Sequence, residues 1–156
     1  IIFGDQNEGE VASGVPHIPF EALNENYEID KEAYLEYFRK MHKLFPKCKK
    51  MVMAVRNQIA SSHHTLSGLL YDSQEDKLYT TRIYDIQPII DPMGVGDAFV
   101  AAYIHAHQKW GDKNQYCLDF SLSASAIKNT IPGDQNLVSE EEIIHNMTSS
   151  GGRIQR

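Results

Sequence analysis

The stretch DPMGVGDAF, residues 91–99, places two glycines one residue apart next to an acidic residue, at the start of a helical pattern. Gly94 and Gly96 allow backbone conformations that larger residues avoid, and they let a ligand approach the main chain closely. At the start of a helix, unpaired N–H groups and the helix dipole attract anions, phosphate above all. Taken alone, such a stretch is more often a strand-to-helix turn with Asp97 as the N-cap or a first-turn acid.

Two common phosphate-binding motifs do not fit this stretch. The glycines are not followed by Gly-Lys-Ser/Thr, so it is not a Walker loop. Phe99 stands where a dinucleotide-binding fingerprint has its third glycine. A phosphate-binding function would therefore need a different design.

The pattern around this stretch predicts an α/β fold. Helices are predicted at residues 8–13, 31–44, 97–110, 114–128 and 139–147, the last opened by a capping box of Ser139 and Glu142. Helix 31–44 carries an apolar stripe of Tyr34, Leu35, Phe38, Met41 and Leu44. Strands are predicted at residues 1–3 and 51–55, and a hairpin is predicted from residues 65–71 and 77–84. Helices that alternate with buried strands indicate a largely parallel sheet.

Composition narrows the possible functions. The 156 residues are 42% hydrophobic and 23% charged, with a net charge of −6, and they suffice for one domain with a core. The dispersed basic residues argue against nucleic-acid binding. Cys48 and Cys117 stand far apart, which favours a reducing compartment such as the cytoplasm over a disulfide framework. No apolar run is long enough to predict a membrane span.

The stretch 91–99 strongly resembles the second signature of the PfkB (ribokinase-like) sugar kinases, whose usual form is D-T-T-G-A-G-D-x-F. This resemblance implies a ribokinase-like three-layer α/β/α fold. It also implies that Asp97 is the base that takes the proton of the sugar hydroxyl. The backbone amides of Gly94, Val95, Gly96 and Asp97 would form the anion hole for the γ-phosphoryl group. A carboxylate base and a set of backbone amides are suited to phosphoryl transfer, because this reaction depends on positioning and charge stabilisation more than on a strong base.

The resemblance also implies ion-binding positions. Residues 1–15 resemble the family segment that carries N-x-x-E, so Glu8 would help to order Mg²⁺ and phosphate, while Asp5 stands where the family has Asn. The alternative for Glu8 is an ordinary acid at a helix start. Asp91 and Gly133 correspond to a loop that binds a monovalent cation such as K⁺.

Five residues are expected near the nucleotide. Residues 51–57 resemble the strand that leads into the ATP site, with Ala54, Arg56 and Asn57 near the nucleotide. Arg56 is either a phosphate-reaching cation or a surface arginine. The helix 114–128 is similar to the one that flanks adenine, which places Ser121 and Ser125 near the base. The alternative for both serines is close helix packing.

Longer segments are similar to those of 2-dehydro-3-deoxygluconate kinases within this family: residues 56–72, residues 130–139 and the terminal GGRIQR, residues 151–156. The resemblance implies MgATP-dependent phosphorylation of a hydroxyl of that sugar acid, and a ribokinase- or fructokinase-type substrate is the alternative.

The chain opens with Ile-Ile-Phe-Gly, as though inside a strand. We therefore expect residues 1–156 to be the C-terminal nucleotide-binding and catalytic portion of such a kinase. The sugar-binding residues and the lid, through which a homo-oligomer can form, would lie outside it. A non-catalytic fragment that binds a nucleotide or a partner is a further alternative.

Overall fold

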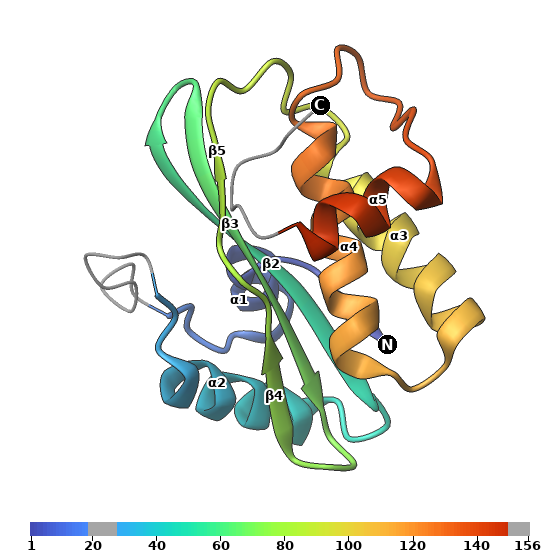
Figure 1. The fold of residues 1–156 in the computed structure, drawn as a ribbon. Helices are drawn as coiled ribbons and strands as arrows, with labels where there is room; N and C mark the ends of the chain where they lie inside the picture. Colours follow the sequence, from blue (N-terminus) through green and yellow to red (C-terminus); the bar gives the residue numbers. More distant parts are fainter. Residues whose placement is uncertain (19–27, 150–156) are drawn as a thin grey trace. The chain divides into compact units, whose positions relative to one another are not determined.

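The computed structural model describes residues 1–18 and 28–149 (Figure 1). The chain divides into two compact units. Unit 1 consists of Ile1–Met53 and Leu69–Tyr79, and unit 2 of Ala54–Gly68 and Thr80–Arg156. The strands β2 (Lys50–Ala60), β3 (His63–Asp72) and β4 (Lys77–Thr80) contribute residues to both units. The terminal GGRIQR, on which part of the substrate hypothesis depends, lies outside the described residues.

Unit 1 combines a parallel strand pair with two helices, α1 (Gln6–Ser13) and α2 (Lys31–Leu44). β1 (Ile2–Phe3) pairs in parallel with the first half of β2, as Ile2 with Met51 and Phe3 with Val52. The predicted strand 51–55 is confirmed but longer, because β2 continues to Ala60 as one arm of a hairpin.

The buried stripe of α2 differs from the predicted one. Tyr34, Tyr37, Phe38 and Met41 are its buried residues, at the i, i+3, i+4, i+7 spacing of one helix face. Leu35 is half-buried and Leu44, the last helical residue, is 53% exposed. Tyr37 belongs to the buried face of α2, and Leu35 and Leu44 do not, because Tyr37 lies on the same side of the helix as Tyr34 and Met41.

Unit 2 contains three helices that pack in series, α3 (Val95–Trp110), α4 (Asn114–Lys128) and α5 (Glu140–Thr148) (Figure 1). α3 packs against α4, and α4 packs against α5. The predicted capping box at Ser139 and Glu142 opens α5. α4 is buried along almost its whole length, which makes it the core element of this unit.

The strand predicted at residues 77–84 is two strands, β4 and β5 (Tyr84–Ile86), and both pair with β3. Arg82 explains the break, because its guanidinium donates to the Asn146 and Ser149 carbonyl oxygens at the end of α5, both at 2.5 Å. Two of the carbonyls that a helix end leaves unpaired are satisfied in this way.

The five strands of the sheet are ordered β1-β2-β3-β4, with β5 also on β3. The predicted hairpin of β3 and β4 is present, and a second hairpin joins β2 and β3 through Ser61 and Ser62. β3 and β5 run antiparallel, with His64 opposite Ile86. Among the described strands, β1 and β2 are the parallel pair, so the prediction of a largely parallel sheet is wrong here. Short turns join β2 to β3 and β3 to β4, and strands joined in this way run antiparallel.

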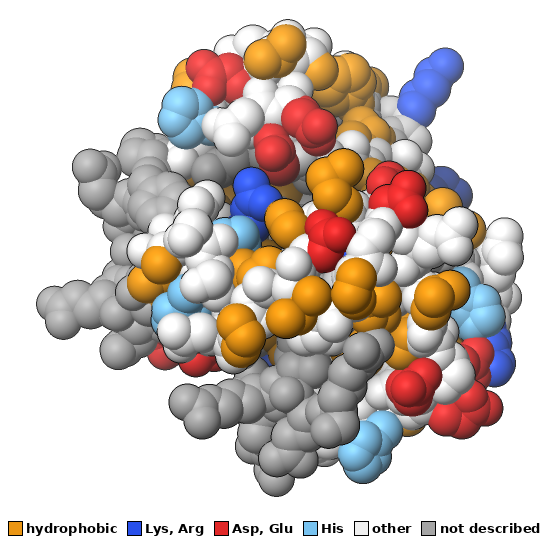
Figure 2. Space-filling model, turned by 90° about the horizontal axis from the view of Figure 1, so that it is seen from above, with side chains coloured by type: hydrophobic (Ala, Val, Ile, Leu, Met, Phe, Trp, Pro, Cys, Tyr) orange, Lys and Arg blue, Asp and Glu red, His pale blue; other side chains and the backbone are white. Residues whose placement is uncertain are grey.

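Two surface properties bear on function. None of the helices within residues 1–18 and 28–149 is long and apolar enough to cross a membrane. On the face drawn in Figure 2, the Lys and Arg side chains among the coloured residues are scattered and do not gather into one patch.

Candidate functional site

The start of α3 forms a tight turn that requires glycine at one position. Gly94 is the N-cap residue of α3 and has a left-handed backbone, with φ of 72°. A Cβ atom at this position would lie only 2.1 Å from the Asp134 carbonyl oxygen. Both the backbone angle and this close approach exclude a side chain, so the fold itself explains Gly94.

Gly96 lies two residues later, and the fold does not explain it. A Cβ atom there would have no described neighbour within 4 Å, and its φ is not in the left-handed region. Glycine inside a helix costs about 0.5–1 kcal/mol relative to alanine. Gly96 is the second residue of α3, and no described neighbour requires a glycine there.

Within residues 1–18 and 28–149, no side chain caps the first turn of α3. Asp97 lies in this turn and is exposed, so it is the first-turn acid and not the N-cap. The positive end of the helix dipole thus faces Gly94, Val95, Gly96 and Asp97 without a capping side chain. These four residues, predicted as anion hole and base, lie together at one exposed helix start.

Asp91 joins this turn to the loop that follows α4. Its two carboxylate oxygens accept from the backbone N–H groups of Met93, at 3.0 Å, and Gly133, at 2.8 Å. These two hydrogen bonds, followed by the nearby positive charge of Lys128, lower the pKa of Asp91. The structure therefore brings Asp91 and Gly133 into direct contact, while the monovalent cation expected beside them stays a prediction.

Ser121 and Ser125 are buried and their hydroxyls serve helix packing. Ser121 donates to the Phe99 carbonyl oxygen at 2.5 Å, and Ser125 donates to the Val95 carbonyl oxygen at 3.1 Å. Both bonds join α4 to the first two turns of α3. Ser125 thereby fixes the first helical residue of the candidate anion hole, and the packing alternative accounts for both serines.

Ala54, Arg56 and Asn57 lie on β2. Ala54 is half-buried, and the buried Asn57 has its amide 3.4 Å from the Thr65 hydroxyl on β3. Arg56 is exposed, and it lies near His64, whose pKa is lowered by burial and by the charges of Arg56 and His63.

The hairpin of β2 and β3 is tied to the segment that precedes the glycine turn. The Ile89 N–H donates to the Ser62 carbonyl oxygen at 3.0 Å. Ile90 and Asp91 then donate to the Asn129 carbonyl oxygen at the end of α4. Backbone hydrogen bonds therefore link the hairpin, the segment before α3 and the end of α4 within unit 2.

Glu8 lies in unit 1 and forms a capping box with Asp5. The Glu8 carboxylate accepts from the Asp5 N–H at 3.0 Å, while Asp5 accepts from the N–H groups of Asn7 and Glu8, both at 2.8 Å. The acid expected to order Mg²⁺ thus has a structural role at the start of α1. Within the described part of the chain, no three His, Cys, Asp or Glu side chains gather to hold a metal ion.

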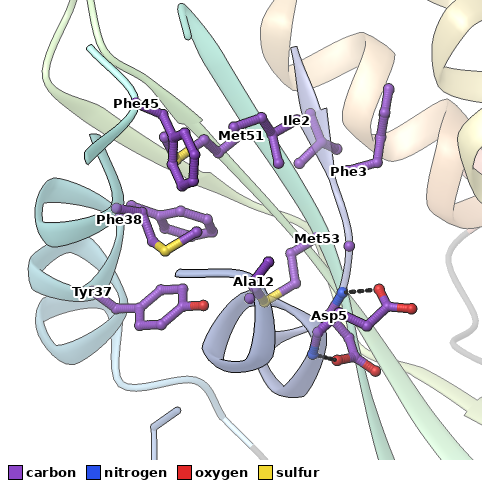
Figure 3. Close-up of a pocket in the computed structure, with 14 residues that line it drawn as sticks. Ile2, Phe3, Asp5, Ala12, Tyr37, Phe38, Phe45, Met51 and Met53 are labelled. Carbon is purple, nitrogen blue, oxygen red and sulfur yellow. Dashed lines mark hydrogen bonds between the residues drawn. The ribbon is translucent and has the colours of Figure 1, made fainter. Parts of the chain in front are cut away.

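A cavity of about 160 Å³ lies in unit 1, between α1, α2 and the first strands (Figure 3). Its lining is mostly apolar and includes Ala12, Tyr37 and Met53, with Asp5 and Glu8 as its acidic members. The Tyr37 hydroxyl is buried and has no hydrogen-bond partner among the described residues, and burial raises its pKa. A lining without a basic side chain offers no counter-charge for a phosphate.

Two residues near the glycine turn were not predicted from the sequence. Asp134 contacts Gly94 through its backbone, and this contact leaves no sequence signal. Lys128 is fully buried at the end of α4. A lysine within a helix of small and apolar residues is the signal that could have identified it.

The chain matches no protein-family model, and no curated protein sequence matches it. Solved structures do match. The 2-dehydro-3-deoxygluconokinase of Thermotoga maritima has a TM-score of 0.79 and 26% identity, over 94% of this chain and 40% of that one. A PfkB family carbohydrate kinase of Listeria grayi has a TM-score of 0.73 and 25% identity, over 96% and 42% of the two chains. The ribokinase of Arabidopsis thaliana, solved with ribose and ATP, has a TM-score of 0.61 and 17% identity, over 95% and 40%.

These similarities define a class. The chain has a ribokinase-like α/β fold and resembles PfkB carbohydrate kinases over nearly its whole length, which confirms the fold and the resemblance expected from residues 91–99. Within that class, a protein with 26% identity is a 2-dehydro-3-deoxygluconokinase. The chain spans about two fifths of the length of these solved structures.

Proposed function

We propose that this chain is the nucleotide-binding and catalytic portion of an ATP-dependent carbohydrate kinase that phosphorylates 2-dehydro-3-deoxygluconate. One observation carries the proposal. Among the described residues, the start of α3 has no side-chain cap, no neighbour requires glycine at position 96, and Asp97 is exposed beside it. An anion such as a phosphoryl group would complete this helix start.

In the proposed reaction, the sugar hydroxyl oxygen forms a bond to the γ-phosphorus of ATP. The bond from that phosphorus to the β–γ bridging oxygen breaks, and ADP leaves with its electron pair. Asp97 accepts the hydroxyl proton, and the backbone N–H groups of Gly94, Val95 and Gly96 stabilise the charge on the transferring oxygens.

Mg²⁺ would reach this site mainly through the nucleotide. The ion binds proteins through one or two carboxylates together with substrate phosphates, and it neutralises charge on the β- and γ-phosphates. Glu8 accepts the Asp5 N–H in the cap of α1, and Asp91 accepts the Met93 and Gly133 N–H groups before α3; their expected roles as ion ligands stay predictions.

The choice of sugar is supported by sequence similarity and by the match to the Thermotoga maritima enzyme. Residues 56–72 form β2, β3 and their turn, and residues 130–139 form the loop that contacts Gly94 and Asp91. Both segments are similar to those of 2-dehydro-3-deoxygluconate kinases. We expect the sugar-selecting residues to lie in the part of such kinases that this chain does not span.

The proposal is tested with Asp97→Asn in a longer protein that contains this chain. We expect turnover of 2-dehydro-3-deoxygluconate to fall about 10²–10⁴-fold, as for loss of a general base. ATP affinity and melting temperature should be unchanged, because Asp97 is exposed. The matched control is Glu141→Gln, which removes an exposed first-turn acid from α5 and should leave turnover unchanged.

Three results would contradict parts of the proposal. Near-normal turnover by Asp97→Asn would exclude Asp97 as the base. Failure of the wild-type protein to bind ATP would exclude the site itself. Faster turnover of ribose or fructose than of 2-dehydro-3-deoxygluconate would exclude the proposed sugar while retaining the kinase. ATP binding by the 156-residue chain without turnover would show that the chain needs the rest of such a kinase.

A further inference from the structure

The cavity of about 160 Å³ in unit 1 carries a polar group that its own walls leave unpaired (Figure 3). Tyr37 belongs to the buried face of α2 and is 4% exposed. Its hydroxyl is buried and has no hydrogen-bond partner within residues 1–18 and 28–149. Figure 3 shows this hydroxyl pointing from α2 toward Ala12 of α1. A buried hydroxyl without a partner is costly, and phenylalanine would fill the same space without that cost.

Gly9 makes room for the Tyr37 hydroxyl. It lies inside α1 and its backbone is not left-handed, so the helix itself does not require glycine there. A Cβ atom at Gly9 would clash with the Tyr37 hydroxyl oxygen. Glycine inside a helix is less favourable than alanine. The chain therefore carries two unfavourable residues, Gly9 and Tyr37, which together place one hydroxyl group in the cavity wall.

The size and lining of the cavity favour one small aromatic ring. An apolar cavity of about 150 Å³ can hold one benzene molecule, and the volume of this cavity is similar. Aromatic and methionine side chains, which pack well against an aromatic ligand, contribute much of the lining: Phe38, Met41, Phe45, Met51 and Met53. Methionine side chains are also flexible, so these walls can adapt to a ligand.

The polar groups of the lining decide which kind of ring fits. A charged ligand would lose its hydration in this mostly apolar space, and the acidic Asp5 and Glu8 would also repel an anion. Burial, followed by the charges of Asp5 and Glu10, raises the pKa of Tyr37. Its hydroxyl therefore keeps its proton at neutral pH and can donate a hydrogen bond. The ligand that meets these conditions is neutral and carries one oxygen that accepts a hydrogen bond.

We propose that this cavity binds a neutral molecule with one aromatic ring and one oxygen acceptor, of the size of benzyl alcohol, and that the Tyr37 hydroxyl donates a hydrogen bond to that oxygen. Every described residue that lines the cavity belongs to Ile1–Met53 of unit 1, so the site is built within one compact unit. The proposal goes beyond the kinase function, and its tests need neither ATP nor a sugar.

Methionine methyl groups report on this site directly. The chain has five methionines, of which Met41, Met51 and Met53 line the cavity, whereas Met93 and Met147 belong to unit 2. The 156-residue chain with isotope-labelled methionine methyl groups is titrated with benzyl alcohol and followed by NMR. We expect saturable shifts of the three cavity methyl groups, with a dissociation constant of about 1 mM or below, and unchanged positions of the other two. Shifts of all the methionine methyl groups, or of none, would overturn the proposal.

Tyr37→Phe tests the hydrogen bond. Without ligand, this variant should melt at the wild-type temperature or higher, because the hydroxyl loses no partner. Its affinity for benzyl alcohol should be about 2–10-fold weaker, and its affinity for toluene, which has no oxygen, should equal that of wild type. The matched control is Tyr79→Phe, which removes a hydroxyl that donates to Glu75 at 2.5 Å and should leave both affinities unchanged. A lower melting temperature of Tyr37→Phe, or an unchanged affinity for benzyl alcohol, would contradict the role of the hydroxyl.

A larger side chain at Ala12 should fill the cavity. Ala12 lines it from α1 and is exposed, so the helix can accept leucine there. In Ala12→Leu, benzyl alcohol should no longer shift the cavity methyl groups. The matched control is Val11→Leu, which enlarges the neighbouring residue, 90% exposed and outside the lining, and should keep wild-type binding. Wild-type binding by Ala12→Leu would place the ligand elsewhere and overturn the proposal.

The same titration in a longer protein that contains this chain decides whether the site persists there. The chain spans 40% of the Thermotoga maritima kinase that it resembles, so further residues can lie against unit 1 in such a protein. We expect the same saturable shifts of the cavity methyl groups. Loss of these shifts in the longer protein would show that its other residues fill the cavity, and would overturn the proposal.

Discussion

The starts of α1 and α3 were both predicted as functional, yet they are built in opposite ways. At α1, Asp5 and Glu8 cap each other's backbone N–H groups, so the first turn is satisfied within the chain. At α3, Gly94 is the N-cap, and no side chain in the part of the chain that the structure describes makes a capping hydrogen bond there. Both helices carry an acid in the first turn, but only the acid of α1 is used by the fold.

This difference separates a helix start that is complete from one that a ligand can complete. The carboxylates at α1 already occupy the positive end of its dipole, where a phosphate would meet two negative charges. At α3, the glycines keep side chains away and Asp91 acts one turn earlier, on Met93 and Gly133. A local sequence pattern of acid and glycine does not distinguish these cases, whereas the hydrogen bonds do.

The largest expected effect concerns the two glycines of α3. Gly94→Ala forces a left-handed backbone on alanine, which costs about 1–3 kcal/mol. Its Cβ atom would also meet the Asp134 oxygen at 2.1 Å. We therefore expect a clear loss in the free energy of unfolding, measured by urea denaturation.

Gly96→Ala is the matched variant and should give the opposite result. It meets open space, so we expect stability unchanged or raised by up to about 1 kcal/mol, together with weaker ATP binding. Equal stability losses for the two variants would remove the distinction between them. Unchanged ATP affinity in Gly96→Ala would argue that no ligand approaches the main chain there.

A smaller effect is expected at α1. Asp5→Ala removes an N-cap and should destabilise the chain by about 0.5–2 kcal/mol without changing ATP affinity. Asp30→Ala is the control, because Asp30 caps α2 in the same unit through the N–H groups of Glu32 and Ala33. Both losses are read from urea denaturation. If only Asp5→Ala weakened ATP binding, the start of α1 would take part in phosphate binding and the contrast with α3 would be wrong.

Local patterns in the sequence predicted most of the elements. Helix periodicity placed α2, α3 and α4 to within about two residues, because their apolar faces repeat at helical spacing. The break between β4 and β5 was missed, because it depends on Arg82 reaching the end of α5, more than 60 residues later in the chain. The exposure of Leu44 was missed for a related reason, since periodicity shows which face is apolar but not where the covering layer ends.

The candidate site was predicted where its residues are close in sequence. Gly94, Val95, Gly96 and Asp97 are contiguous, and the resemblance to a known signature located them. Contacts over a long sequence separation were harder to foresee. The pairing of Asp91 with Gly133 came from resemblance alone, and the buried charge of Lys128 gave no motif. The capping role of Glu8 could have been predicted, because an acid three residues after Asp5 is the pattern of a capping box.

The smallest expected effect is a pH dependence that compares one carboxylate from each unit. Asp91 in unit 2 has a lowered pKa because of the Met93 and Gly133 N–H groups, and Asp76 in unit 1 has a pKa of about 2 because of Arg39 and Tyr71. A carboxylate with a lowered folded-state pKa contributes stability above its unfolded pKa of about 3.9, and this contribution is lost as the pH falls through the folded pKa.

Asp91→Asn and Asp76→Asn should therefore each be less stable than wild type at pH 7, and each difference should shrink as the pH falls below about 4 towards the folded pKa. Thermal melting between pH 7 and pH 2 measures both differences. ATP affinity at pH 7 separates the two variants. We expect only Asp91→Asn to weaken it, because its amide has one acceptor oxygen for two N–H groups and releases either the turn or the loop. Equal ATP affinities in the two variants would show that the turn keeps its geometry without Asp91, and that the open start of α3 does not depend on the loop after α4.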